Sequence, residues 1–259
     1  MNLEFSALSS GSSGNCFYVR NPLSKVAVLI DAGMTAKKTE ERLTSIGRSI
    51  KEIKGIFITH EHSDHIAGAD VLARKHKIPV YATKKTFLDR YICREEDQIL
   101  IKNNETTTLG GMRVEAFSKT HGAADPVSYN VTKENKKISI ITDAGMACKN
   151  ITSNINESNI LCMESNHDPK MVSEGTYPAF LKKWITSDTG HLSNQQSALA
   201  VLEHASTKLR KVVLSHLSSH NNTPHEALHT YKNLIKERSD LRPQITVSTR
   251  YAATPIMKV

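Results

Sequence analysis

Short apolar runs alternate along this 259-residue chain with segments in which apolar residues recur every three or four positions. Short runs are typical of buried strands, and periodic segments are typical of amphipathic helices. The pattern predicts strands at residues 5–8, 16–19, 26–30, 56–58, 79–82, 99–101, 112–117, 129–132, 138–142, 160–163, 212–214 and 245–247. It predicts helices at 35–46, 66–73 and 84–91, after the capping sequence that begins at Ser193, and after Thr223.

No repeat, low-complexity tract or long linker interrupts these elements. A chain of this length can form one large domain or two small ones. Because strands and helices mix throughout, we favour a single α/β domain over residues 1–259, in which layered sheets are covered by helices.

The composition is that of an ordinary soluble globular protein, with 39% hydrophobic and 23% charged residues. Lys and Arg outnumber Asp and Glu by 34 to 26, which gives a net charge of +8. A basic surface favours polyanions such as nucleic acid, although this charge can also serve solubility alone. Aromatic residues make up only 5%, so no platform for stacking bases is evident.

The four cysteines, Cys16, Cys93, Cys148 and Cys162, have no CxxC spacing. They are expected to be free buried thiols in a reducing compartment. The N-terminus shows no basic region followed by an apolar one, and the longest apolar run, 26–30, is too short to span a bilayer. We therefore expect a cytoplasmic protein that does not associate with membranes.

Four side chains that commonly bind metals lie between the strand at 56–58 and the next helix. They are His60, His62, Asp64 and His65. Nitrogen and carboxylate ligands of this kind suit zinc or manganese. His60 and His62 are two apart on an extended segment and so point the same way, whereas Asp64 and His65 begin the helix and aim elsewhere. The spacing predicts two metals side by side, one held by each pair; a solvated His-rich turn is the alternative.

Three further ionisable residues follow predicted strands: His121, Asp143 and His216. A buried strand that ends in an ionisable residue needs a partner there, because an unpaired buried charge is costly. With the first four, these residues make up the roughly seven groups that two metals sharing one bridging ligand require. Taken singly, each could instead be a capping or surface residue.

Asp31 ends the strand at 26–30, with Gly33 close behind. Its expected role is to accept a hydrogen bond from a ligand histidine and so orient the ring. Capping of the helix that starts near Thr35 is the alternative.

In this order along the chain, the candidate ligands resemble those of the metallo-β-lactamase-fold superfamily, and the match covers nearly the whole chain. The resemblance implies an αββα sandwich with a dinuclear metal site at one edge of its two sheets. It implies that one metal is held by His60, His62 and His121. It implies that the other is held by Asp64, His65 and His216, with Asp143 as the bridge.

Four segments resemble the bacterial YycJ/WalJ group within that superfamily: Ser9 to Asn15, Glu164 to Asp168, Gly190 to Asn194 and Leu214 to Ser218. Members of that group are linked to exonuclease action on duplex DNA from a 5′ end, so the resemblance implies a 5′-to-3′ exonuclease. Other branches fit less well, because they carry cysteine at the position of Asp143 or glutamate at that of His62. The short interval between Asp143 and His216 leaves no room for the extra domain of the β-CASP nucleases.

The reaction expected from such a site is hydrolysis of a phosphodiester. Two divalent metals, zinc or manganese, would activate a bridging water that attacks phosphorus. Asp64, as a ligand beside that water, would orient it or accept its proton.

The leaving oxygen also needs a proton, and His191 is the candidate donor. His191 lies two residues before Ser193, which begins a capped helix whose N-terminus favours phosphate. Glu164 is expected to hold the His191 ring and keep it protonated, and His167 is a candidate phosphate contact. Both histidines could instead be plain loop residues.

Five lysines close in sequence to these loops are candidate contacts to the DNA backbone: Lys119, Lys149, Lys170, Lys182 and Lys183. Two other functions remain open, a hydrolase of a small ester, thioester or lactam on the same fold, and a non-catalytic metal-binding or nucleic-acid-binding module. The His191 and Glu164 segments and the basic charge favour the nuclease.

Overall fold

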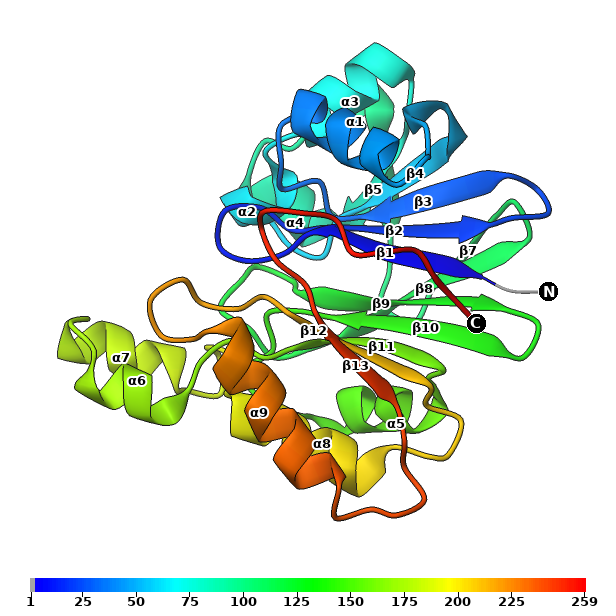
Figure 1. Ribbon diagram of the computed structural model, residues 1–259. Helices are drawn as coiled ribbons and strands as arrows, with labels where there is room; N and C mark the ends of the chain where they lie inside the picture. Colours follow the sequence, from blue (N-terminus) through cyan, green and yellow to red (C-terminus); the bar gives the residue numbers. More distant parts are fainter. Residues whose placement is uncertain (1–2) are drawn as a thin grey trace. The chain divides into compact units, whose positions relative to one another are not determined.

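The computed structural model describes residues 3–259 and shows two compact units (Figure 1). Unit 1 comprises Met1–Ser118, Ala123–Lys136 and Thr249–Val259, and unit 2 comprises Lys119–Gly122 and Lys137–Ser248. Each unit contains strands and helices, and each is described by itself below.

Unit 1 is built on a mixed sheet with the strand order β14-β1-β2-β3-β4-β5-β6. Its strands are β1 (Glu4–Ser9), β2 (Cys16–Asn21), β3 (Val26–Ile30), β4 (Ile53–Phe57), β5 (Val80–Thr83), β6 (Gln98–Ile101) and β14 (Met257–Lys258). The pairs from β14 to β3 are antiparallel and those from β3 to β6 are parallel. The unit also holds an antiparallel ribbon of β7 (Thr106–Leu109), β8 (Met112–Ser118) and β9 (Val127–Lys133).

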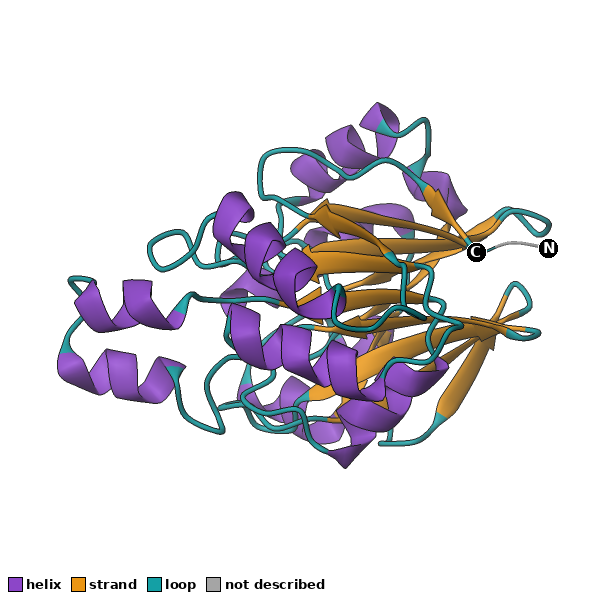
Figure 2. Ribbon diagram, turned by 60° about the horizontal axis from the view of Figure 1, so that its bottom comes forward, coloured by secondary structure: helices purple, strands orange, loops and turns teal. Residues whose placement is uncertain are grey.

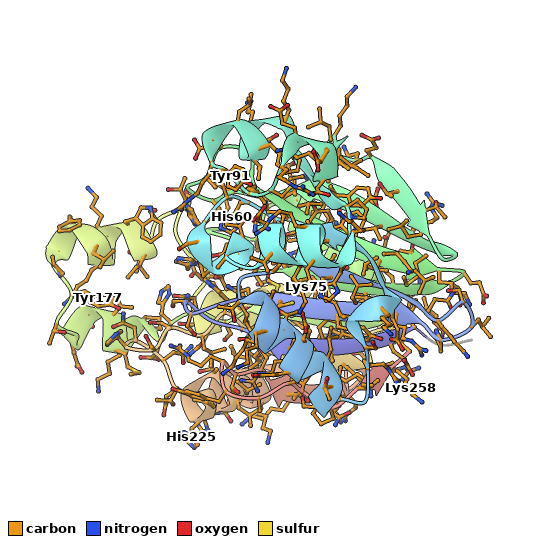
Figure 3. All side chains as sticks on the ribbon, turned by 90° about the horizontal axis from the view of Figure 1, so that it is seen from above. His60, Lys75, Tyr91, Tyr177, His225 and Lys258 are labelled. Carbon is orange, nitrogen blue, oxygen red and sulfur yellow. The ribbon has the colours of Figure 1, made fainter. Side chains whose placement is uncertain are left out.

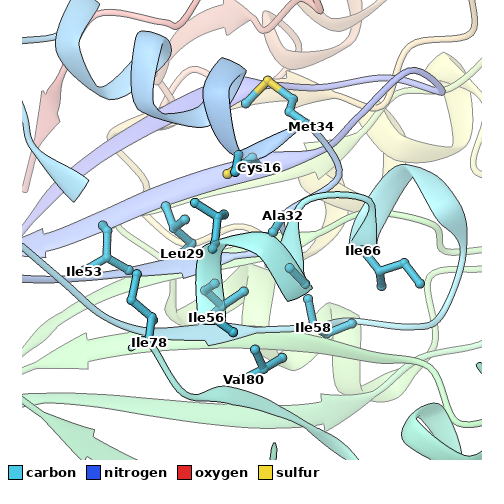
Figure 4. Close-up of a cluster of buried hydrophobic side chains, with 14 of the residues drawn as sticks. Cys16, Leu29, Ala32, Met34, Ile53, Ile56, Ile58, Ile66, Ile78 and Val80 are labelled. Carbon is cyan, nitrogen blue, oxygen red and sulfur yellow. The ribbon is translucent and has the colours of Figure 1, made fainter. Parts of the chain in front are cut away.

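The helices of unit 1 flank its sheet (Figure 1). They are α1 (Ala36–Ser45), α2 (Ser63–Ile66), α3 (Ala69–His76) and α4 (Lys84–Asp89), with 3-10 turns at Ile50–Glu52 and Glu95–Asp97. Leu43 of α1 and Leu72 of α3 join Leu29 and Ile56 of the sheet in one buried cluster. Figure 4 shows part of this cluster, with Leu29 and Ile56 labelled. Burial of side chains of this size contributes about 1.5–3 kcal/mol each. This core holds the ends of β3 and β4, from which four candidate ligands follow.

Unit 2 contains four parallel strands in the order β13-β12-β11-β10. They are β10 (Lys136–Ile141), β11 (Ile160–Glu164), β12 (Lys211–Ser215) and β13 (Gln244–Val247). The helices are α5 (Lys149–Glu157), α6 (Pro169–Glu174), α7 (Ala179–Ile185), α8 (Asn194–His204) and α9 (Pro224–Ile235). Helix α8 packs against α5 and α9, whereas the α6–α7 hairpin projects from the unit (Figures 1 and 2). Because the carboxyl ends of parallel strands share one edge, Asp143, Glu164 and His216 gather there.

All the predicted strands are found, and Val26–Ile30 has the predicted bounds. The prediction of one helix over residues 66–73 is wrong, because two helices, α2 and α3, occupy this stretch and are separated at Gly68. The Gly68 backbone NH donates to Ala32 O (2.8 Å), and a Cβ at Gly68 would lie 2.0 Å from Met34 O. The close approach of residues 32–34 therefore breaks the helix.

The four cysteines are free thiols, as predicted, and three of them are buried while Cys148 is half-buried. Within residues 3–259, no helix has the length and apolar character that crossing a membrane requires.

Candidate metal centre

In unit 1, His60 and His62 follow β4 and turn their rings toward one point. The distance from His60 Nε2 to His62 Nδ1 is 3.0 Å, and the ring planes stand at 75°. His60 Nδ1 lies 2.9 Å from the hydroxyl of Thr59, which itself donates to Asp31 (3.0 Å). Because the Thr59 proton is engaged with Asp31, the hydroxyl accepts from His60 Nδ1. That arrangement leaves the lone pair of His60 on Nε2, the nitrogen that faces His62.

Asp31 holds the ring of His65, one of the candidate ligands. His65 Nδ1 donates to Asp31 Oδ2 (2.7 Å), and both side chains are fully buried. The other carboxylate oxygen of Asp31 accepts from the Thr59 backbone NH (2.8 Å). A histidine that donates through Nδ1 carries its lone pair on Nε2, which is the form that binds a metal.

Asp64 lies at the start of α2, beside an asparagine that the sequence reasoning did not single out as a site residue. Asn15 Nδ2 lies 3.2 Å from Asp64 Oδ2 and 3.1 Å from His65 Nε2. Asn15 is in turn held by the loop between β1 and β2, because its Oδ1 accepts from the Gly11 NH (2.9 Å). The Ser9–Asn15 segment thus places a neutral amide against two candidate ligands. The available signals were its Ser-Gly composition and its resemblance to the YycJ/WalJ group.

Gly33 permits the close backbone approach that places Asp64. A Cβ at Gly33 would lie 1.7 Å from the Asp64 carbonyl oxygen, so no larger residue fits without movement. We expect Gly33→Ala to lower the free energy of unfolding by about 1–3 kcal/mol through overpacking, as measured by urea denaturation. Gly122→Ala is the matched control, since its nearest contact would be an ordinary 3.5 Å. Equal stability of both variants would contradict this account.

In unit 2, two candidate ligands lie close to a carboxylate oxygen of a third. Asp143 Oδ1 lies 3.4 Å from His216 Nε2 and 3.8 Å from His121 Nε2. His121 Nδ1 donates to Gly190 O (3.0 Å), which places the lone pair on Nε2. Burial lowers the pKa of His121 to about 4, so the ring is neutral near pH 7 and suited to bind a metal.

Glu164 ends β11 and is the hub of this cluster. Its Oε1 accepts from His216 Nδ1 and from His191 Nδ1, both at 2.9 Å. Its Oε2 accepts from the backbone NH groups of Ala144 (2.8 Å) and Leu192 (3.2 Å). Although burial raises the pKa of Glu164, the charge and hydrogen bond of His191 and the hydrogen bond of His216 outweigh it and bring that pKa below its usual range. Glu164 is therefore a carboxylate with four donors, which links a candidate ligand to the candidate proton donor.

Asp31, Asp143 and His216 share an uncommon backbone conformation. Each follows the end of a strand with a positive φ, at 60°, 53° and 55° respectively. This left-handed region is costly for residues with a Cβ, and such strain gathers at functional sites. The left-handed conformation thus occurs at three residues that were chosen as candidates because each follows a predicted strand.

The two predicted substrate-binding residues, His167 and Ser193, are joined by a β-bridge but differ in the hydrogen bonds of their side chains. Ser193 caps α8, with its hydroxyl donating to Gln196 Oε1 (2.8 Å) and accepting from the Gln196 NH (3.1 Å). His167 is buried, and among the described residues its Nδ1 has no hydrogen-bond partner. Burial lowers the pKa of His167 to about 4, so its ring is neutral near pH 7.

Lys119, one of the five lysines suggested as contacts to the DNA backbone, is buried. Lys119 is only 7% exposed, and its Nζ donates to Thr142 O (2.5 Å). A buried ammonium that is already hydrogen-bonded to the backbone is poorly placed to contact a solvent-exposed phosphate, so Lys119 does not fit this suggestion. Lys149, Lys170 and Lys183 are exposed.

The donors present suit a borderline divalent metal. In unit 2 alone, Asp143, Glu164, His191 and His216 offer ligand atoms that all lie within 4.8 Å of one another. Imidazole and carboxylate together are the usual ligands of zinc, with manganese also possible. Both units therefore present buried ligand groups that are oriented by neighbouring side chains.

Comparison with known proteins agrees with this arrangement. The model of the metallo-beta-lactamase superfamily matches residues 10–216, a span that includes all the candidate ligands. The chain is 37% identical over 242 residues to Exodeoxyribonuclease YycJ of Bacillus anthracis, which covers 92% of this chain and 91% of that protein. It is 35% identical over 243 residues to Exodeoxyribonuclease WalJ of Streptococcus pneumoniae, which covers 92% and 90% respectively.

A solved structure shows the same fold at low identity. The metallo-beta-lactamase fold protein YhfI of Bacillus subtilis superposes with a TM-score of 0.74 at 11% identity, over 100% of this chain and 99% of that one. The predicted fold of two mixed sheets flanked by helices is thereby confirmed. By the match of residues 10–216 and the identity to two relatives along nearly their whole length, the chain belongs to the metallo-β-lactamase superfamily.

Proposed function

We propose that this protein is a metal-dependent exodeoxyribonuclease that degrades duplex DNA in the 5′-to-3′ direction. The observation that carries the proposal is the Glu164 cluster, in which a buried carboxylate orients both a candidate metal ligand and a candidate proton donor. The two relatives named exodeoxyribonucleases support the reaction class, and the net charge of +8 suits a polyanionic substrate.

Two divalent metals, zinc or manganese, are part of the proposal. The ligands proposed for one are His60, His62 and His121. Those proposed for the other are Asp64, His65 and His216, with Asp143 shared. When bound, the metals would lower the pKa of a water molecule and neutralise charge on the phosphate.

Two side chains, those of Asp64 and His191, carry out the two proton transfers of the proposed reaction. Asp64 accepts the proton of the attacking water or orients that water. His191 donates a proton to the leaving oxygen from Nε2, because its Nδ1 is already committed to Glu164. Glu164 holds the His191 ring in place by accepting the hydrogen bond from Nδ1 (2.9 Å). His167 and Ser193 are proposed to lie along the path of the substrate phosphates.

A cleavage assay tests this function against the small-molecule hydrolase. Purified protein loaded with manganese or zinc is incubated with duplex and single-stranded DNA and RNA, labelled at the 5′ or the 3′ end. We expect a 5′ label on duplex DNA to be released first as mononucleotide. Intact nucleic acid with fully metallated protein would end the proposal, and cleavage of RNA alone or from the 3′ end would correct its substrate or polarity.

Asp31→Asn offers a separate test of ligand orientation. The amide keeps the shape of Asp31 but loses the charge that holds the His65 Nδ1 proton. Loss of such a supporting partner typically lowers metal affinity by about 10- to 100-fold. Titration of the metal-free protein with zinc, followed by calorimetry, measures the change. An unaltered affinity would show that Asp31 acts only in folding.

A further inference from the structure

Trp184 is the single tryptophan of the chain and lies on α7, in the hairpin that projects from unit 2 (Figures 1 and 2). Tyr177, labelled in Figure 3, lies at the turn of the same hairpin. The Trp184 residue is 38% exposed, so part of the indole faces solvent.

The buried part of the indole rests on two residues of the candidate centre. Its ring centroid lies 5.3 Å from that of His191, at an angle of 88°, and 6.2 Å from that of His121. The backbone holds this position, because the His191 NH donates to Ile185 O (2.9 Å). Gly190 is part of the same contact, since a Cβ there would lie 2.1 Å from Trp184 O. The Trp184 ring is therefore held in a fixed position beside His191, the proposed proton donor.

The surroundings of Trp184 have the chemistry of a strand-binding surface. Phe180 lies four residues earlier, on the same side of α7, and is 75% exposed. Lys182 and Lys183 belong to the same helix, which carries no acidic residue. Exposed aromatic rings beside cationic side chains are how proteins hold single nucleotides, by stacking on bases while the charges follow the backbone.

We propose that Trp184 stacks on the nucleobase at the 5′ terminus, next to the linkage that is cut. This inference rests on the proposed function and adds a substrate-binding residue to it. The indole contacts the histidine that donates to the leaving oxygen, so a base on its exposed face would be held one nucleotide from the reaction. Because every base has a π-face, the contact gives positioning without sequence preference.

Intrinsic fluorescence tests the proposal directly, because Trp184 is the only indole in the protein. The metallated wild type is titrated with a duplex whose terminal linkages are nuclease-resistant phosphorothioates. We expect stacking to quench the emission at saturation. A duplex of the same length with an abasic nucleotide at each 5′ end should bind with little quenching. Equal quenching by both duplexes would overturn the proposal.

Cleavage kinetics test the stacking of Trp184 independently of its fluorescence. Stacking of one base on an aromatic ring corresponds to about a 5- to 150-fold change in binding. We expect Trp184→Leu to lower kcat/KM on an ordinary duplex by a factor in that range, and Trp184→Phe to retain most of the activity. On the abasic-ended duplex, wild type and Trp184→Leu should be cut equally. Tyr91→Ala removes another exposed aromatic ring, whose hydroxyl donates to Asp70, and should change neither measurement.

The outcomes separate the two proposals. If wild type cuts duplex DNA and Trp184→Leu cuts it equally fast, the stacking proposal is wrong while the nuclease stands. If metallated wild type cuts no nucleic acid, the function itself fails. Should Trp184→Leu lose metal or unfold, the fluorescence titration of the wild type still decides.

Discussion

Asp64→Asn is expected to abolish DNA cleavage while leaving the protein folded. Asp64 lies in the first turn of α2 with its side chain 20% exposed, so an amide of the same shape fits without a cavity. The amide has no charge to hold a divalent cation or to accept a proton. Loss of several kcal/mol of transition-state stabilisation corresponds to a fall in the cleavage rate of at least about 10³-fold. Cleavage of end-labelled duplex DNA and metal content by mass spectrometry measure the two effects.

Asp70→Asn is the matched control for this experiment. Asp70 also lies in the first turn of a helix, α3, where it accepts from Arg74 Nε (2.9 Å) and Tyr91 OH (3.0 Å). Exposed pairs of this kind contribute about 0–1 kcal/mol, so the variant should keep its metal and its activity. If Asp64→Asn also kept both metals and cut DNA at the rate of Asp70→Asn, the proposed role of Asp64 would be wrong.

Much of the fold was predictable because buried strands leave short apolar runs bounded by polar turns. Val26–Ile30 and Ile160–Glu164 are examples, and both are buried along nearly their whole length. The strand ends were equally informative. Asp143 and His216 were selected because each follows a buried run, and the structure holds both in the left-handed conformation with their side chains 3.4 Å apart.

Other features depend on contacts that no local pattern records. The β7 strand was missed because its sequence, Thr106–Leu109, contains no apolar run, and the helix α5 was missed because it buries only two apolar residues. Thr59 and Asn15 orient candidate ligands, yet a threonine and an asparagine in a loop resemble any others. The low aromatic content concealed Trp184, because one indole in the right place does not alter a composition.

His191→Ala is expected to lower turnover on DNA by about 10²- to 10⁴-fold, the usual contribution of a general acid. The metals should remain, because the proposed ligand set does not include His191. The loss should be smaller for an aryl phosphodiester such as bis(p-nitrophenyl) phosphate. Nitrophenolate leaves without a proton, whereas the sugar alkoxide of DNA does not. The ratio of the two losses therefore measures proton donation rather than damage to the site.

His225→Ala serves as the control, since the side chain of that histidine is 80% exposed on α9, where it contacts Glu226 (3.1 Å) and the ring of His229. Two results would count against the assignment of His191. Equal losses on DNA and on the aryl ester would show that the variant disturbs the site generally. Loss of a metal would make His191 a ligand, which the cluster of Asp143, Glu164, His191 and His216 would accommodate, because their ligand atoms lie within 4.8 Å. Metal content measured beside the two rates therefore distinguishes a proton donor from a ligand in the same variant.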